Sequence, residues 1–156
     1  MLDIPSITGI VAAIGVIVGV VFTVLELRNL VQTRQTDLIM RLYSTYGSKE
    51  FLEATSRVTD IASGNYEDFV KKYGYADVLQ VGTFFEGLGV LLRRKLIGIQ
   101  LADDLFSEPV KTTWRFMEHM IETDRKRLNQ PRIFEWFEYL AVEIQKKEQQ
   151  QASKTA

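Results

Sequence analysis

The chain has no cysteine and a single histidine, His119. Without cysteine it forms no disulfide, no thiolate nucleophile and no zinc or iron–sulfur site built on thiolates. One histidine also excludes a metal site that draws several histidines from one chain. Because His119 lies between Glu118 and Met120, away from the apolar stripe of its segment, we predict a surface position rather than a place in a catalytic triad.

The sequence also lacks a charge excess of either sign, with 19 Lys and Arg against 20 Asp and Glu. Nucleic-acid binding usually needs a concentrated basic surface, so no nucleic-acid partner is predicted. Two short basic clusters, Arg93-Arg94-Lys95 and Arg125-Lys126-Arg127, each stand at the expected end of a helix. Cations complement the helix dipole there, although they also suit anionic lipid headgroups. No cofactor and no metal is predicted.

One segment lacks charge altogether: no Asp, Glu, Lys or Arg occurs from Ile4 to Leu25. As a helix this segment is roughly 33 Å long, enough for a hydrocarbon core of about 30 Å. Its flanks, Met1-Leu2-Asp3 and Glu26-Leu27-Arg28, lack the basic start and the small-residue cleavage site of a signal peptide. Residues 1–28 are therefore predicted to be a transmembrane anchor in contact with the lipid bilayer.

The charges beside this segment predict its orientation. Arg28, Arg34 and Arg41 follow it, whereas Asp3 and the α-amino group precede it. Cytoplasmic flanks are enriched in Arg and Lys. We therefore expect a single-pass protein of the plasma membrane, with the N-terminus outside and the C-terminal domain in the cytoplasm.

Small residues recur four positions apart within the anchor. Gly15 and Gly19 form a GxxxG pair, and Gly9 and Ala13 form a second pair of the same spacing. Such strips let two transmembrane helices approach closely. They predict association of the anchor with a second copy or with another membrane protein, the alternative being chance in a span rich in Val and Ile.

The rest of the chain predicts helices without strands. Residues 29–46 continue the anchor as a juxtamembrane helix, and Gly47-Ser48 ends it, with Ser48 capping the next helix. Further breaks are expected at Ser63-Gly64-Asn65, where Asn65 is a second cap, and at Gly74. Residues 47–145 are predicted to form a cytosolic helical domain. Residues 146–156, mostly Gln, Lys, Glu and small residues, are predicted to be a disordered tail.

Apolar residues at helical spacing define the expected core of that domain. The most apolar stretch is expected to be a central, enclosed helix whose seam consists of Tyr75, Val78, Gly82, Phe85, Gly89, Leu92 and Leu96. A glycine inside a helix costs about 1 kcal/mol against alanine. Gly82 and Gly89 therefore predict the close approach of a neighbouring helix.

After a turn at Gly98, the pattern predicts a short helix, Ile99–Phe106, and then a new helix that Ser107 caps, with Pro109 in its first turn. A last helix is expected after Asn129-Gln130-Pro131. The aromatic residues recur at helical spacing, which is typical of a core. The predicted fold class is all-α: a single transmembrane helix followed by a helical bundle.

Two groups of carboxylates are candidate site residues. Glu86 falls at the margin of the enclosed side of the central helix, where a buried carboxylate sometimes marks a site, and an ion pair with an arginine of a neighbouring helix is the favoured explanation. Asp103, Asp104 and Glu108 offer oxygen ligands for a hard cation, but lack EF-hand spacing. Their alternative role is that of acidic residues near a helix N-terminus.

The run from Phe84 to Ile97, followed by Asp104-Leu105-Phe106 and Trp114, resembles a family known as a domain of unknown function. The similarity covers about residues 38–144. It implies a transmembrane helix before an all-α cytosolic domain, and a bacterial or archaeal origin. It implies no activity, ligand or catalytic residue.

We therefore predict a membrane-tethered, non-enzymatic interaction or accessory module, either oligomeric or part of a larger membrane complex. A first alternative is a small homo-oligomeric channel with Thr8, Thr23 and Glu26 turned inward. A second is a membrane-bound enzyme or a metal- or metabolite-binding protein that uses Glu86 or the Asp103-Asp104 pair. The sequence contains no motif that names a reaction.

Overall fold

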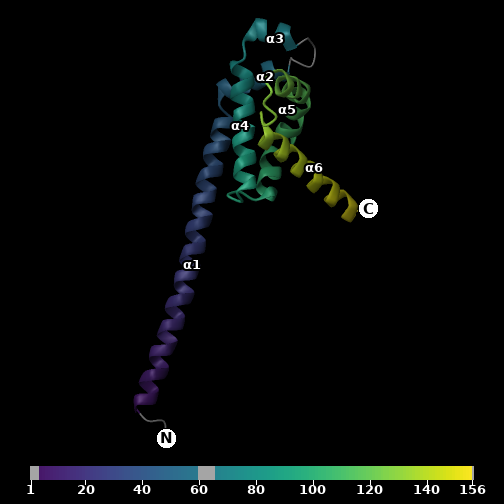
Figure 1. Ribbon diagram of the computed structural model, residues 1–156. Coiled ribbons are helices and arrows are strands. Elements are labelled where there is room, and N and C mark those ends of the chain that lie inside the picture. The colour runs from purple at the N-terminus through teal and green to yellow at the C-terminus, as the bar shows by residue number, and fades with distance from the viewer. Residues whose placement is uncertain (1–3, 60–65, 156) are drawn as a thin grey trace. The chain divides into compact units, whose positions relative to one another are not determined.

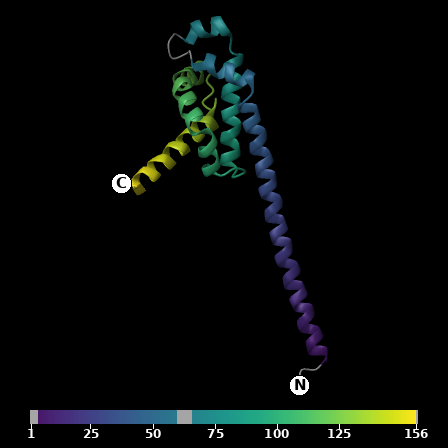
Figure 2. The same ribbon diagram turned by 180° about the vertical axis from the view of Figure 1, so that it is seen from behind.

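A computed structural model describes residues 4–59 and 66–155, and all the regular structure in these ranges is helical. The helices are α1 (Ile4–Tyr46), α2 (Lys49–Thr59), α3 (Tyr66–Tyr73), α4 (Ala76–Arg93), α5 (Ile99–Arg127) and α6 (Glu135–Thr155) (Figure 1, and from behind in Figure 2). The all-α prediction is confirmed over the described residues. The expected break at Ser63-Gly64-Asn65, with its cap, lies outside them.

The chain divides into two compact units, Met1–Leu42 and Tyr43–Ala156. The first unit, called unit 1 below, contains all of α1 except its last turn. The second, unit 2, contains that turn and helices α2 to α6. The second unit thus begins four residues before residue 47, where the sequence places the start of the cytosolic domain.

The ends of the early helices follow the sequence signals. The Ser48 hydroxyl oxygen accepts a hydrogen bond from the Phe51 amide at 3.2 Å and caps α2, as predicted. Phe51, Ala54 and Val58 are buried on one face of α2. Gly74 ends α3 with a φ of +79°, in the region that favours glycine.

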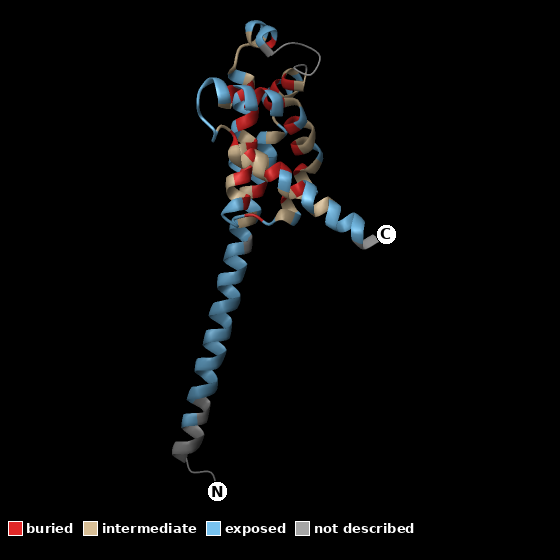
Figure 3. Cartoon of the chain, turned by 45° about the vertical axis from the view of Figure 1, so that its right-hand side comes forward, coloured by how far each residue is buried: buried red, intermediate tan, exposed pale blue. Residues whose placement is uncertain are grey.

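The core of unit 2 lies around α4, which packs against α2, α5 and α6. Figure 3 shows the buried residues gathered in this unit. The ring of Phe85 stacks on that of Phe137 with centroids 4.9 Å apart, and Trp114 meets Phe137 edge-on at 5.1 Å. Val78, Gly82, Phe85, Gly89 and Leu92 are buried, as the central-helix prediction requires. The two ends of the predicted seam differ: Tyr75 precedes α4 and is half-buried, and Leu96 is 49% exposed. Because α4 ends at Arg93, Leu96 lies in the following turn rather than on the seam.

The close approach predicted at the two glycines of α4 is confirmed, and the neighbour is the start of α6. A methyl group on Gly82 would lie 2.5 Å from the ring of Phe134. On Gly89 it would lie 2.0 Å from the carbonyl oxygen of Trp136. Both values are far inside van der Waals contact, so a larger residue at Gly82 would have to displace the Phe134 ring, and one at Gly89 would have to displace the backbone of Trp136.

The predicted break before Ser107 is wrong, because α5 is one helix from Ile99 to Arg127 with Pro109 inside it. Ser107 does not act as a cap; its hydroxyl donates to a Glu148 carboxylate oxygen at 2.9 Å. A proline inside a helix removes one backbone hydrogen bond. The continuous buried face on both sides of Pro109 offsets that loss; it consists of Ala102, Phe106, Val110 and Thr113.

The predicted disordered tail is also wrong for residues 146–155, because α6 continues to Thr155. Gln, Lys, Glu and Ala are good helix formers. Two contacts from α5 also hold this segment. Lys147 Nζ lies 2.6 Å from an Asp103 oxygen, and Glu148 lies 2.6 Å from Lys111 Nζ. Composition alone did not reveal these partners.

Candidate functional site

The most unusual surface of the chain is that of α1. Between Ile14 and Val31, twelve large apolar side chains are exposed: Ile14, Val16, Ile17, Val18, Val20, Val21, Phe22, Val24, Leu25, Leu27, Leu30 and Val31. Their exposed fractions run from 46% to 69%. By length and composition α1 is the one helix in the described ranges that could cross a membrane, and none of its most apolar window is buried. This surface differs from that of a core helix, which is mostly enclosed.

The small residues of α1 form two open pairs, Gly9 with Ala13 and Gly15 with Gly19, on faces about 120° apart because an α-helix turns about 100° per residue. The pair Gly15 and Gly19 is called the strip below. Gly9, Ala13, Gly15 and Gly19 are exposed, and a methyl group on any of the three glycines would meet nothing within 4 Å. Thr23 turns its hydroxyl back to the Gly19 carbonyl at 2.8 Å, and Glu26 is exposed. The side chain of Thr8 is outside the described part. The strip therefore has room for a second helix backbone.

In unit 2, Glu86 caps the start of α6 rather than pairing with an arginine. Its Oε2 accepts hydrogen bonds from the backbone amides of Trp136 at 2.9 Å and Phe137 at 2.8 Å. The first amides of a helix have no acceptor inside that helix. Among the described residues no arginine lies within ion-pair distance of Glu86, so the predicted ion pair is wrong. The carboxylate has a structural task that joins α4 to α6.

The surroundings of Glu86 shift its ionisation. Burial of the carboxylate raises its pKa above the ordinary value of 4.5, and the nearby Glu135 raises it further. The hydrogen bonds from Phe137 and Trp136, together with the positive charge of Arg125, act in the opposite direction. The net direction is upward, so burial outweighs the capping bonds. This carboxylate therefore costs free energy in its charged form.

Arg125 fixes the connection between α5 and α6. Its Nε donates to the Ile133 carbonyl at 2.9 Å, and its Nη1 donates to Glu138 Oε2 at 2.7 Å. Its remaining nitrogen, Nη2, is buried without a hydrogen-bond partner in the part of the chain that the structure describes. Two residues of this connection, Asn129 and Phe134, each have a φ of 52°. Arg125 thus stabilises a tight turn that inserts Phe134 against Gly82.

The acidic cluster of α5 is used for contacts within unit 2. Asp103 pairs with Lys147 at 2.6 Å, and Glu108 pairs with Lys111 at 2.7 Å. Asp104 accepts a hydrogen bond from the side-chain amide of Gln100 at 3.2 Å. Because α5 begins at Ile99, none of them is in a first turn, and that part of the prediction is wrong. No group of three potential metal ligands occurs within residues 4–59 and 66–155. His119 is exposed on α5, as predicted.

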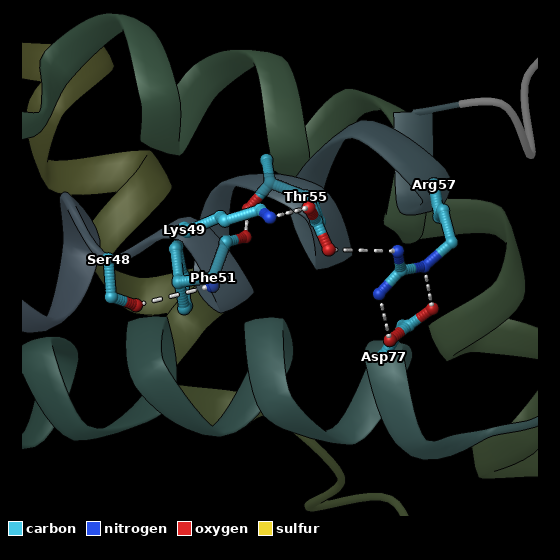
Figure 4. A network of polar contacts seen from close by, with 7 residues as sticks. Ser48, Lys49, Phe51, Thr55, Arg57 and Asp77 are labelled. Carbon is cyan, nitrogen blue, oxygen red and sulfur yellow. Dashed lines mark hydrogen bonds and ion pairs between the residues drawn. The ribbon is translucent and has the colours of Figure 1, made fainter.

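A network at the start of α4 escaped the sequence analysis. The guanidinium of Arg57 on α2 binds both carboxylate oxygens of Asp77, at 2.6 and 3.0 Å (Figure 4). The hydrogen bonds that Arg57 donates to Asp77 raise the pKa of Arg57. Asp77 is in the first turn of α4, a favourable place for an acid that the sequence does reveal. The partner twenty residues away leaves no local signal.

A second missed group is Asp124, which is 1% exposed. It accepts hydrogen bonds from the Tyr75 hydroxyl at 3.0 Å and from Arg127 at 2.6 Å. A buried carboxylate is tolerated when it is paired and hydrogen-bonded. The described carboxylates that lie in or near the core thus serve to connect helices.

The fold and these contacts define a class: an all-helical chain whose N-terminal helix exposes an apolar surface and whose remaining helices enclose their own core. Residues 10–144 match the sequence profile of the family described as "Domain of unknown function (DUF4760)", and the chain belongs to this family. No curated protein matches the chain. No solved structure matches it either. The resemblance to an uncharacterised family is thereby confirmed.

Proposed function

We propose that this chain is a membrane-tethered, non-enzymatic interaction module, with α1 as its single transmembrane helix and a cytoplasmic helical bundle as its working part. The observation that carries this proposal is the exposed apolar surface of α1 between Ile14 and Val31. Burying one large apolar side chain is worth about 1.5–3 kcal/mol. If twelve such side chains stay in water, the burial free energy that is lost exceeds the typical net stability of a domain, which is about 5–15 kcal/mol. A bilayer removes that cost.

The proposed orientation has the N-terminus outside the plasma membrane of a bacterial or archaeal cell. It rests on Arg28, Arg34 and Arg41, which follow the uncharged segment. The proposed interaction is association through α1, with a second copy or another membrane protein. It rests on the two open pairs of small residues, Gly9 with Ala13 and Gly15 with Gly19.

Two measurements test the tether and its orientation. The full chain is expected to sediment with membranes after alkaline carbonate extraction and to be released by detergent. Because the chain has no cysteine, Asp3→Cys and Ser153→Cys each give a single reactive thiol. An impermeant maleimide added to intact cells is expected to label the first variant and not the second. Release by carbonate contradicts the tether, and labelling of the second variant contradicts the orientation.

The interaction is tested by native mass spectrometry of the chain in mild detergent. Self-association gives masses at multiples of 17.9 kDa, and a hetero-complex gives 17.9 kDa plus the mass of a partner that co-purifies. A chain that remains monomeric and alone across detergents contradicts the role of an interaction module.

A further inference from the structure

The sequence contains the same short motif twice: three consecutive cations and then a leucine, at the end of a helix. Arg93-Arg94-Lys95-Leu96 starts at the last residue of α4 and continues into the following turn, whereas the three cations of Arg125-Lys126-Arg127-Leu128 are the last residues of α5. The two leucines are almost equally exposed, at 49% and 46%. If the only role of these cations were to complement the helix dipole, we would expect the two motifs to have similar ion-pair partners.

The copy that ends α5 is occupied by contacts inside unit 2. Arg125 binds Glu138 and the Ile133 carbonyl. Arg127 donates to the buried Asp124 at 2.6 Å. These cations therefore serve to hold the end of α5 and the turn that follows it.

The copy that ends α4 has no such partners. Arg93, Arg94 and Lys95 are all exposed, and among the described residues no carboxylate lies within ion-pair distance of any of them. The nearest acidic residues along the chain are Glu86, which caps α6, and Asp103, which pairs with Lys147. Three adjacent positive charges thus remain uncompensated on the surface.

The surroundings of this copy are apolar rather than acidic. The guanidinium carbon of Arg93 lies 6.0 Å from the centre of the Trp136 ring. Lys95 has a φ of 58°, and the turn it forms exposes Leu96 directly beside the cations. An exposed apolar side chain beside several cations suits the interface of an anionic bilayer, where headgroups are negative and the acyl region is apolar.

We propose that the turn between α4 and α5, residues 93–96, binds an anionic phospholipid surface, with Arg93, Arg94 and Lys95 at the headgroups and Leu96 at the acyl boundary. This proposal rests on the membrane tether, because an anchored chain keeps the turn at a high effective concentration of lipid. A nucleic acid would engage the same cations through its phosphates. A patch of three charges on a chain of net charge −1 is small for that purpose, and Leu96 gives no base contact.

The test uses the full chain reconstituted into bilayers of phosphatidylcholine, with or without phosphatidylserine. One thiol for a nitroxide spin label is introduced in each of three variants, Leu96→Cys, Leu128→Cys and Val18→Cys. The label is apolar, so an apolar group still stands at each position. Power saturation of the electron paramagnetic resonance signal measures contact with oxygen, which concentrates in hydrocarbon, and with a water-soluble nickel chelate.

The label at position 96 is expected to gain oxygen contact and lose nickel contact when phosphatidylserine is present. The label at 128 is expected to remain in water. Arg94→Gln is expected to lower the ratio of lipid-contacting to water-exposed label at position 96 roughly fivefold, since each surface cation contributes about that preference for an anionic bilayer. Lys126→Gln, which neutralises one exposed cation of the other copy, is expected to leave it unchanged.

A label at position 96 that stays in water on both bilayers overturns the proposal, and so does an equal response at positions 96 and 128. The Val18 label separates this failure from that of the tether: hydrocarbon contact at position 18 with water contact at 96 refutes only the lipid-binding turn. Water contact at both positions refutes the tether as well. Protection of position 96 by added RNA, without any effect of phosphatidylserine, identifies a nucleic acid instead and refutes the proposal.

Discussion

Helices α1 and α4 are the two most apolar of the described helices. Each contains a pair of glycines on one face, Gly15 and Gly19 in α1 and Gly82 and Gly89 in α4, yet the surroundings of the two pairs are opposite. In α4, the space beside Gly82 and Gly89 is filled by Phe134 and the Trp136 backbone. In α1, the space beside Gly15 and Gly19 is empty, and the large apolar side chains around them are exposed.

The difference shows what a glycine pattern in a helix does and does not predict. In both helices it marks a face that a neighbour can approach closely. For α4 the rest of the chain supplies that neighbour, since α6 starts there and Glu86 caps it. For α1, nothing lies within 4 Å of a methyl group placed on Gly15 or Gly19. A glycine pattern therefore predicts a face suited to close packing, and the neighbour that uses the face has to be found from other observations.

The largest expected effect comes from removing α1 up to residue 28. The truncated chain, residues 29–156, is expected to lose membrane sedimentation completely while keeping its helices, because unit 2 contains its own core. Circular dichroism and carbonate-resistant sedimentation of the two chains measure both effects. A truncated chain without helical signal would mean that α1 or its partner completes the core, and the contrast between the two helices would fail.

Gly89→Leu is expected to be the most damaging point substitution, because the new side chain meets the backbone carbonyl of Trp136, which cannot rotate away. Overpacking costs about 1–3 kcal/mol, occasionally more, and a backbone obstacle favours the upper end. Gly98→Leu is the matched control: Gly98 has a φ of −85° and nothing within 4 Å, so its effect is expected within about 0.5 kcal/mol. Thermal unfolding of the truncated variants decides the order, and equal stabilities would contradict the packing of α4 against α6.

Gly19→Leu in α1 sharpens the comparison from the other side. With open space around Gly19, the substitution is expected to leave the melting temperature of unit 2 unchanged. It is expected to weaken association of α1 by about 1–3 kcal/mol, because leucine obstructs the approach of a second helix. Native mass spectrometry in detergent compares this variant with Val18→Leu, which leaves the small-residue strip intact. Unaltered association would exclude the strip as the contact.

Glu86→Ala is expected to destabilise unit 2 by about 1–2 kcal/mol, because two first-turn amides of α6 lose their acceptor. Glu86→Gln retains an oxygen that can accept both bonds and removes the charge that burial disfavours. Its stability is expected to equal or exceed that of the parent at neutral pH. Chemical denaturation measures both, and a glutamine variant as unstable as the alanine one would show that the charge itself is needed.

The smallest expected effect is the pH dependence of Glu86. Its pKa is raised in the folded chain, so folding favours the protonated form. The stability penalty is full above the raised folded pKa and disappears as pH falls toward the unfolded value near 4.5. The advantage of Glu86→Gln over the parent is therefore expected at neutral pH and to shrink on acidification. An advantage that grows on acidification would reverse the assigned direction of the shift.

The sequence was sufficient where a signal is local. Ser48 and Gly74 mark helix ends through their own chemistry, and the stripe of α4 is visible in its spacing. Predictions failed where a distant residue decides. Ser107 reads as a helix cap, but its hydroxyl is bound by Glu148, forty-one residues away.

For the candidate site residues, too, local features could be predicted from the sequence and distant partners could not. That Glu86 would lie at the edge of the core could be predicted from its position beside the α4 seam. That its partners would be the amides of Trp136 and Phe137 could not, because the turn before α6 depends on Arg125 and on the positive φ of Phe134. Likewise, Asp103 could be recognised as acidic but not as the partner of Lys147.

The cap that Glu86 provides to α6 also affects how the chain exchanges its amide hydrogens. First-turn amides of a helix usually exchange rapidly because they face solvent without an acceptor. Those of Trp136 and Phe137 are bonded to a side chain fifty and fifty-one residues away. Separation of α6 from α4 breaks both bonds, so slow exchange at these two amides is expected only while the two helices are docked. The exchange rates of the Trp136 and Phe137 amides therefore indicate whether α4 and α6 are docked.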